Sequence, residues 1–348
     1  MTKSYDNAVS VNNAFLAGKN KIINGDFNIN QRAFTSTTTA DTYGFDRWRV
    51  GLSDGTVTYS AQTFTLGTAP VSGYENKNFA RIVTTGQTAA GAQGILVQRI
   101  ESVRTLAGQT ATISFWAKAN TGTPKIALDV RQRFGTGGSP SSNVSTYGGQ
   151  ATLSTSWARY SLTVSVPSLS GITLGTNSDD ALEINLWVSA GTDFNSRTGS
   201  LGIQSNTFDV WGVQVEAGSV ATPFTAATGT LQGELAACQR YYYRTRPVSN
   251  AYGQVGTGMA YGPTTGAFST PLPVAMRTTP SAVEFSSLTV MNSSNSYAVS
   301  ALTLDTNQTT TTNGVVNTTH AFGTITDDYH FLRGNNSTSA YIGFTAEL

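Results

Sequence analysis

Residues 111–134 read ATISFWAKANTGTPKIALDVRQRF and give the clearest indication of the fold class. Apolar and polar side chains alternate on both sides of a central Asn-Thr-Gly-Thr-Pro segment. Alternation with a period of two places successive side chains on opposite faces of a β-strand, whereas Gly, Pro and Asn favour the connection between strands. We therefore predict two strands, residues 111–119 and 125–134.

The same pattern recurs on both sides of this stretch, from residue 21 to about residue 225. Further alternating runs are bounded by Gly, Ser, Asn or Pro clusters and comprise residues 79–84, 157–166, 181–188 and 207–216. Residues 230–240 differ, because Leu231, Leu235 and Cys238 recur at helical spacing behind a potential Thr230 cap. Short strands with frequent turn residues predict a β-sandwich, followed by one short helix and a second β region.

These patterns predict an all-β protein in four parts. The parts are an N-terminal arm for attachment or assembly (residues 1–20), a jelly-roll sandwich (21–228), a linking helix with the entry into the next strand (229–243) and a second, C-terminal β-sandwich (244–348). Residues 340–346 are expected to form the closing strand, in which Ile342 and Phe344 share a face.

The composition argues against several functional classes. Charged residues make up 12% of the 348 residues, and the formal net charge is +1. A chain with so little net charge has no long-range field to attract nucleic acid or an anionic membrane, and no apolar run is long enough for a membrane span. The single cysteine, Cys238, excludes an intrachain disulfide. Without a signal-peptide pattern, we expect folding in the cytosol.

The sequence contains none of the common catalytic motifs. His320 and His330 lie near the C-terminus without the spacing of a metal site, and there is no nucleophile elbow or phosphate-binding loop. A glycosidase needs two facing carboxylates, and nothing singles out such a pair among 20 Asp and Glu residues. We therefore predict a protein that is not an enzyme.

Three of the predicted strands carry aromatic and ionic side chains opposite their apolar face. Those side chains are Trp116, Asp129, Arg131, Glu183, Asn185 and Trp187. Sugar rings have apolar faces and polar edges, so aromatic platforms flanked by carboxylates, amides and guanidinium groups suit a glycan groove. The alternative is that this face packs within the protein or against a neighbouring subunit, where Trp and Arg are also enriched.

Several motifs resemble a family of phage tail-fibre and virion structural proteins. They are KIINGDFNINQR (residues 21–32), YGFDRW (43–48), ISFWAKA (113–119), TSWARY (155–160), FDVWGVQVEAGSVATPF (208–224), ELAACQRYY (234–242) and NNSTSAYIGF (335–344). The resemblance covers roughly residues 20–243. It implies a jelly roll similar to carbohydrate-binding modules, in a tail fibre, spike or capsid decoration appendage. It also implies a structural calcium ion near Asp26 and Asp209, whose oxygen atoms suit that ion.

The sequence therefore predicts a structural component of a phage virion, assembled in the host cytoplasm. We expect a homotrimer that binds other virion proteins through the N-terminal arm, without nucleic acid or membrane insertion. The alternative is an adhesin that recognises bacterial surface polysaccharide. In that case the mixed face, with its aromatic and ionic side chains, would be a binding groove. A glycan-degrading spike is less favoured, because it needs the carboxylate pair.

Overall fold

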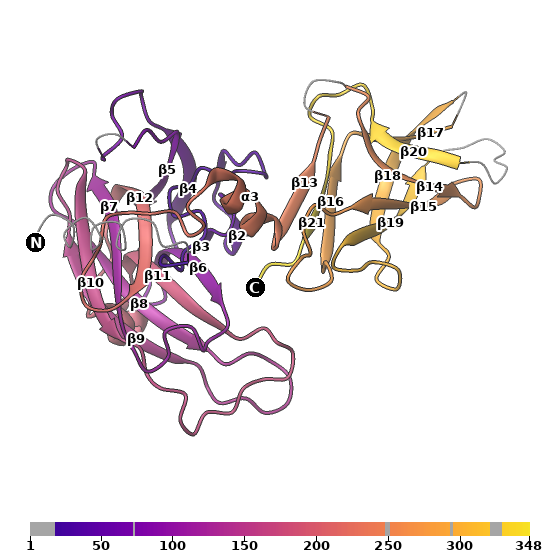
Figure 1. Cartoon of the computed structure of the whole chain (residues 1–348). Helices are drawn as coiled ribbons and strands as arrows, with labels where there is room; N and C mark the ends of the chain where they lie inside the picture. Colours follow the sequence, from indigo (N-terminus) through magenta and orange to yellow (C-terminus); the bar gives the residue numbers. More distant parts are fainter. Residues whose placement is uncertain (1–17, 72–73, 248–250, 293–294, 321–328) are drawn as a thin grey trace, which may run out of the picture. The chain divides into compact units, whose positions relative to one another are not determined.

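The computed structural model describes residues 18–71, 74–247, 251–292, 295–320 and 329–348. Residues 1–17 of the predicted arm lie outside this range. The chain divides into two compact units, unit 1 (Met1–Glu234 with Leu348) and unit 2 (Leu235–Glu347). Figure 1 shows strands in both units and little helix, so the prediction of an all-β protein is confirmed.

Unit 1 is a jelly-roll sandwich of two six-stranded antiparallel sheets. Sheet A has the order β1 (Ser36–Thr37), β4 (Thr56–Thr63), β5 (Asn78–Thr85), β12 (Asn206–Ala217), β7 (Thr110–Ala119), β10 (Ala158–Ser165). Sheet B has the order β2 (Thr42–Tyr43), β3 (Arg49–Ser53), β6 (Gln93–Glu101), β11 (Ala181–Ala190), β8 (Lys125–Arg133), β9 (Val144–Thr152). The chain repeatedly crosses between the sheets, since β6, β8 and β11 belong to sheet B while β7, β10 and β12 belong to sheet A.

The alternating runs of the sequence form the expected strands. All six predicted runs coincide with β5, β7, β8, β10, β11 and β12 to within two residues at each end. Their apolar positions, such as Ile113 and Phe115 in β7 and Leu128 in β8, are fully buried in one core between the two sheets. Burial of one face of each strand is what fixes the strand register, because a slip by one residue would expose that face.

The linking helix is also where the sequence predicts it. Helix α3 (Leu231–Gln239) begins after Thr230, whose hydroxyl oxygen accepts the backbone N–H of Gly233 at 3.1 Å. This is the side-chain cap that the sequence pattern suggests. Two further short elements, η1 (Thr192–Phe194) and α2 (Asn195–Thr198), follow strand β11. No helix in the described ranges is long and apolar enough to cross a membrane.

Unit 2 is β structure, as expected, but its sheets are not two facing open layers. Its strands form a closed barrel in the order β14 (Gln254–Ala260), β15 (Thr265–Pro271), β19 (Asn313–His320), β18 (Ser296–Leu304), β17 (Leu288–Met291), β20 (Tyr329–Gly334). A three-stranded sheet accompanies it, in the order β13 (Tyr242–Thr245), β21 (Tyr341–Thr345), β16 (Ala282–Ser286). Alternation predicts strands equally well in both arrangements and does not indicate closure. Ile342 and Phe344 of β21 are fully buried.

A buried histidine is expected to make the stability of unit 2 depend on pH. His320 is 1% exposed, and its Nδ1 lies 3.0 Å from the hydroxyl of Thr318. Burial, with a smaller contribution from His330, lowers the pKa of His320 from 6.5 to about 4. Because the unfolded chain then binds a proton more readily, we expect the free energy of unfolding to be highest above pH 6.5 and to fall as the pH decreases toward 4.

We therefore expect protection of barrel amides against hydrogen exchange to decline between pH 6.5 and 4 in the full-length protein. The substitution His320→Asn, which keeps a hydrogen-bonding group, should flatten this decline. Equal pH dependence in the variant and the wild type would contradict the assignment to His320.

Candidate functional site

The candidate site lies on the face of sheet B that points away from the sandwich core, called here the outer face of sheet B. In the register of sheet B, Glu183 of β11 lies directly opposite Arg99 of β6 on one side and Arg131 of β8 on the other. Ser145 of β9 lies opposite Arg131 in turn. Directly opposed residues in antiparallel strands project to the same face, so these four side chains form a row.

The structure brings together five of the six residues that the sequence predicts for a shared mixed face. Asp129, Arg131, Glu183, Asn185 and Trp187 all lie on the outer face of sheet B. The prediction is wrong for Trp116, which belongs to β7 and therefore to sheet A. Period-two alternation shows which residues of one strand share a face, but it does not show which strands share a sheet.

Trp116 is held within sheet A by its own neighbours. The guanidinium of Arg159 lies 4.7 Å from its ring centroid, and the Trp211 ring centroid is 5.3 Å away. Gly212, at φ 61°, leaves room for the indole, since a Cβ there would lie 2.8 Å from Trp116 Cε3. The half-buried ring is thus a packing element and not an open platform.

Trp187 is on the correct face but is fully buried. Its ring packs on Phe194 with centroids 4.8 Å apart, and the Arg197 guanidinium lies 5.0 Å from the ring centroid. Arg197 is fixed in turn by Asp129, whose Oδ2 accepts its Nε at 2.9 Å and its Nη2 at 2.5 Å. Helix α2 and the residues around it therefore cover this end of the face, and no sugar can stack on Trp187.

Glu183 is the centre of an ionic cluster. Its Oε2 lies 2.8 Å from Arg99 Nε, 3.6 Å from Arg133 Nη1 and 3.9 Å from Arg49 Nη2. Burial raises the pKa of this carboxyl, but the three guanidinium groups outweigh burial and hold the pKa below its usual value. Glu183 is therefore ionised at neutral pH, and it is 3% exposed.

The solvent-exposed part of the face lies at strands β8 and β9. Tyr147 of β9 pairs with Asp129 and is 41% exposed, Ser145 is exposed, and Arg131 is half-buried. Tyr147 is not apparent from the sequence, because Gly148 and Gly149 interrupt the alternation in β9 at a β-bulge. The short alternation from Val144 to Tyr147 is the only pattern that points to it.

The residues proposed for calcium do not fit a shared ion. The two oxygens of Asp209 accept Arg81 Nε at 2.6 Å and Nη2 at 2.9 Å, and Lys118 Nζ lies 3.7 Å away. The Oδ2 of Asp26 instead accepts the hydroxyl of Tyr74 at 3.0 Å and the amide of Asn28 at 2.7 Å. Calcium needs six to eight oxygen ligands, and the described residues contain no group of three or more acidic, His or Cys side chains that could hold a metal.

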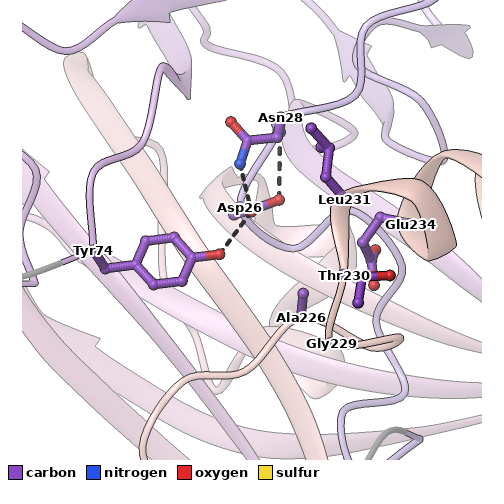
Figure 2. A pocket seen from close by; sticks show the side chains of 8 residues that line it. All are labelled: Asp26, Asn28, Tyr74, Ala226, Gly229, Thr230, Leu231 and Glu234. Atoms are coloured by element: carbon purple, nitrogen blue, oxygen red, sulfur yellow. Dashed lines mark hydrogen bonds between the residues drawn. The ribbon is translucent and has the colours of Figure 1, made fainter.

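A second feature of unit 1 is a small pocket beside helix α3, shown in Figure 2. Asp26 and Glu234 both line it, and burial raises the pKa of both carboxyl groups. A glycosidase requires two carboxyl groups of which one has a raised pKa and the other stays ionised, whereas here burial raises the pKa of both. The cavity volume is only about 90 Å³, whereas ligand pockets usually measure about 300–1,000 Å³.

The carboxyl group of Glu234 is also fully engaged by the protein. It accepts the backbone N–H of Asn24 at 2.8 Å, the backbone N–H of Thr228 at 2.7 Å and the Thr228 hydroxyl at 3.0 Å. These bonds attach the first turn of helix α3 to the loop that contains Asn24. The pocket therefore marks where the helix is fixed to the sandwich, and it offers no room for a sugar ring.

No protein-family model and no curated protein sequence matches the chain. One similar solved structure is the CBM22-2 xylan-binding domain from Paenibacillus barcinonensis Xyn10C, at 17% identity over 53% of this chain and 98% of that domain, with a TM-score of 0.32. Another is the family 11 carbohydrate-binding module from Clostridium thermocellum in complex with a β-1,3-1,4-mixed-linked tetrasaccharide, at 15% identity over 54% of this chain and 98% of that module, with a TM-score of 0.31. Sequence identities and TM-scores this low identify no binding residue in this chain.

Proposed function

We propose that unit 1 binds a glycan on the outer face of sheet B, at strands β8 and β9. The observation that carries this proposal is the exposed ring of Tyr147 beside Ser145 and Arg131. An exposed aromatic ring can stack on the apolar face of a sugar, while a hydroxyl and a guanidinium bind its polar edge. Such a site acts by binding alone.

The Tyr147 ring has a firm support. Gly199 ends helix α2 in the left-handed conformation, and a Cβ at this position would lie 2.4 Å from Tyr147 Cζ. The ring therefore lies close to bare backbone, where any other residue would displace it. A ring that is fixed before binding loses little conformational entropy when a ligand stacks on it.

We expect Tyr147→Ala to weaken glycan binding at least 10-fold, which corresponds to about 1.4 kcal/mol. Ligands would first be identified on an array of bacterial surface polysaccharides, and affinities would then be measured by calorimetry on the full-length protein. Tyr261→Ala serves as the matched control, because Tyr261 is a similarly exposed ring (59%) in unit 2. An equal loss of glycan affinity in the two variants would mean that the glycan does not bind at Tyr147.

The second candidate function is that of a structural component of a phage virion. Its support is the resemblance of the motifs at residues 21–32, 208–224 and 234–242 to tail-fibre and virion proteins. In this role the protein is a homotrimer attached through its N-terminal arm, and glycan binding would serve attachment of the particle to its host. Light scattering of the purified protein tests the trimer, and a monomer at micromolar concentration would contradict it.

A further inference from the structure

The outer face of sheet B has an uneven distribution of charge. A single oxygen of Glu183, Oε2, forms ion pairs with nitrogens of Arg99, Arg133 and Arg49, at 2.8, 3.6 and 3.9 Å respectively. Arg131 lies directly opposite Glu183 in the register, yet it forms no ion pair within the described part of the chain. Positive charge is therefore incompletely neutralised on strand β8.

Two other acidic groups near this face are bound to arginines. Asp129 is bound to Arg197 through Oδ2, and Asp41 lies 2.6 Å from Arg49 Nη1. Glu101 lies on β6, two strands from Arg133 in the register. At the opposite edge of the cluster, the main-chain oxygen of Leu348 accepts Arg99 Nη1 at 2.5 Å and the Tyr43 hydroxyl at 3.0 Å.

The guanidinium groups whose charge is least neutralised are therefore those of Arg131 and Arg133 on β8. Arg131 and Arg133 are two residues apart on one strand, so they share the face, and both are half-buried. Burial comes first among the causes that lower the pKa of Arg133, and repulsion from Arg99, Arg131 and Arg49 adds to it while Glu183 opposes it. A bound anion at this position would relieve that repulsion.

We propose that the glycan recognised by this face is acidic, and that Arg131 and Arg133 bind the carboxylate of a hexuronate-type sugar residue whose ring stacks on Tyr147. Tyr147 is the diagonal neighbour of Arg131 across β8 and β9, which separates the two positions by about 7–8 Å. That spacing suits a sugar ring that carries its carboxylate at one end. Planar guanidinium groups match a carboxylate in a bidentate geometry. This inference rests on the proposed glycan-binding function.

The test compares acidic polysaccharides with their neutral counterparts on the full-length protein. The probes are fragments of polygalacturonate, alginate and hyaluronan, each also prepared with its carboxyl groups reduced to alcohols, and dextran sulfate as a sulfated polyanion. The variants are Arg131→Gln and Arg133→Gln, with Lys77→Gln as a control that removes an exposed positive charge near sheet A.

We expect at least one acidic probe to bind 10-fold or more tightly than its reduced form, and either β8 variant, but not Lys77→Gln, to remove most of that preference. Equal affinity for acidic and reduced forms, lost with Tyr147→Ala, would overturn the acidic specificity while the glycan-binding function stands. Binding of dextran sulfate as tight as that of the hexuronates would show attraction by charge density alone and overturn the carboxylate assignment. If no acidic or neutral glycan binds, both proposals fail.

Discussion

Replacing Asn24 with alanine is expected to lower the free energy of unfolding of unit 1 by about 3–5 kcal/mol. Asn24 is fully buried, and its side chain closes two loops at once. Its Nδ2 donates to the carbonyl oxygens of Ile29 at 2.8 Å and Asp46 at 3.0 Å, while its Oδ1 accepts the N–H of Ile29 at 2.8 Å. Alanine removes all three of these buried hydrogen bonds, and the Ile29 carbonyl oxygen then keeps only the N–H of Asp46, at 3.3 Å.

The backbone at Asn24 adds a second cost. Its φ is 56°, in the left-handed region that asparagine tolerates better than alanine. The variant Asn24→Gly separates the two contributions, because glycine accepts this conformation but makes no side-chain hydrogen bonds. We expect Asn24→Gly to be destabilised by roughly 1 kcal/mol less than Asn24→Ala.

The measurement is urea unfolding followed by tryptophan fluorescence. All five tryptophans of the chain precede residue 212, so the signal reports unit 1. The control is Asn195→Ala, an exposed position in helix α2 with an ordinary helical backbone, where the change should stay within about 0.5 kcal/mol. If Asn24→Ala is no less stable than this control, the hydrogen bonds of Asn24 do not matter for folding.

Asn24 also belongs to a segment whose structure the sequence does not predict. The alternation of the strands predicts their positions, because burial of one face leaves a repeated record along the chain. The segment from Asn24 to Trp48 has no such period. Its order depends on single contacts, such as the bond from Trp48 Nε1 to the carbonyl oxygen of Asn24 at 2.8 Å. A motif can therefore be recognised in the sequence although its role in ordering the fold is not predictable from it.

The candidate site was predictable only in part, for a related reason. Five residues of the predicted face do lie together, since they follow the alternation of β8 and β11. The assignment of β7 to the other sheet depends on a crossover, which alternation does not reveal. Whether a ring is covered depends on elements outside the strands. Trp187 is covered by Phe194 of η1 and Arg197 of α2, whereas Tyr147, on a strand interrupted by a bulge, stays exposed.

Replacing Glu183 with glutamine is expected to destabilise unit 1 by about 2–3 kcal/mol at low salt, since this removes the buried counter-charge of three arginines. The expected loss is below that of a fully buried pair, because Arg49, Arg99 and Arg133 are 16–29% exposed and water screens them. Added salt should reduce the difference from wild type. The control is Glu75→Gln, an exposed carboxylate away from the cluster.

The pH dependence gives an independent check of the same charge. The pKa of Glu183 in the folded protein lies below its ordinary value of 4.5, so its stabilisation is complete above pH 4.5 and is lost as the pH falls through the folded pKa. The difference between wild type and Glu183→Gln should therefore shrink as the pH falls below 4.5. A difference that is constant with pH would mean that the variant disturbs packing and not charge.

Stability and acidic-glycan binding should respond to Glu183→Gln in opposite directions. The substitution removes the negative charge opposite Arg131 in the register, so more positive charge faces a bound carboxylate while the unliganded fold loses its internal counter-ion. We therefore expect lower stability in urea together with tighter binding of hexuronate probes. A general disturbance of sheet B would weaken both. Weaker binding in a folded Glu183→Gln protein would thus argue that the arginines serve only the fold.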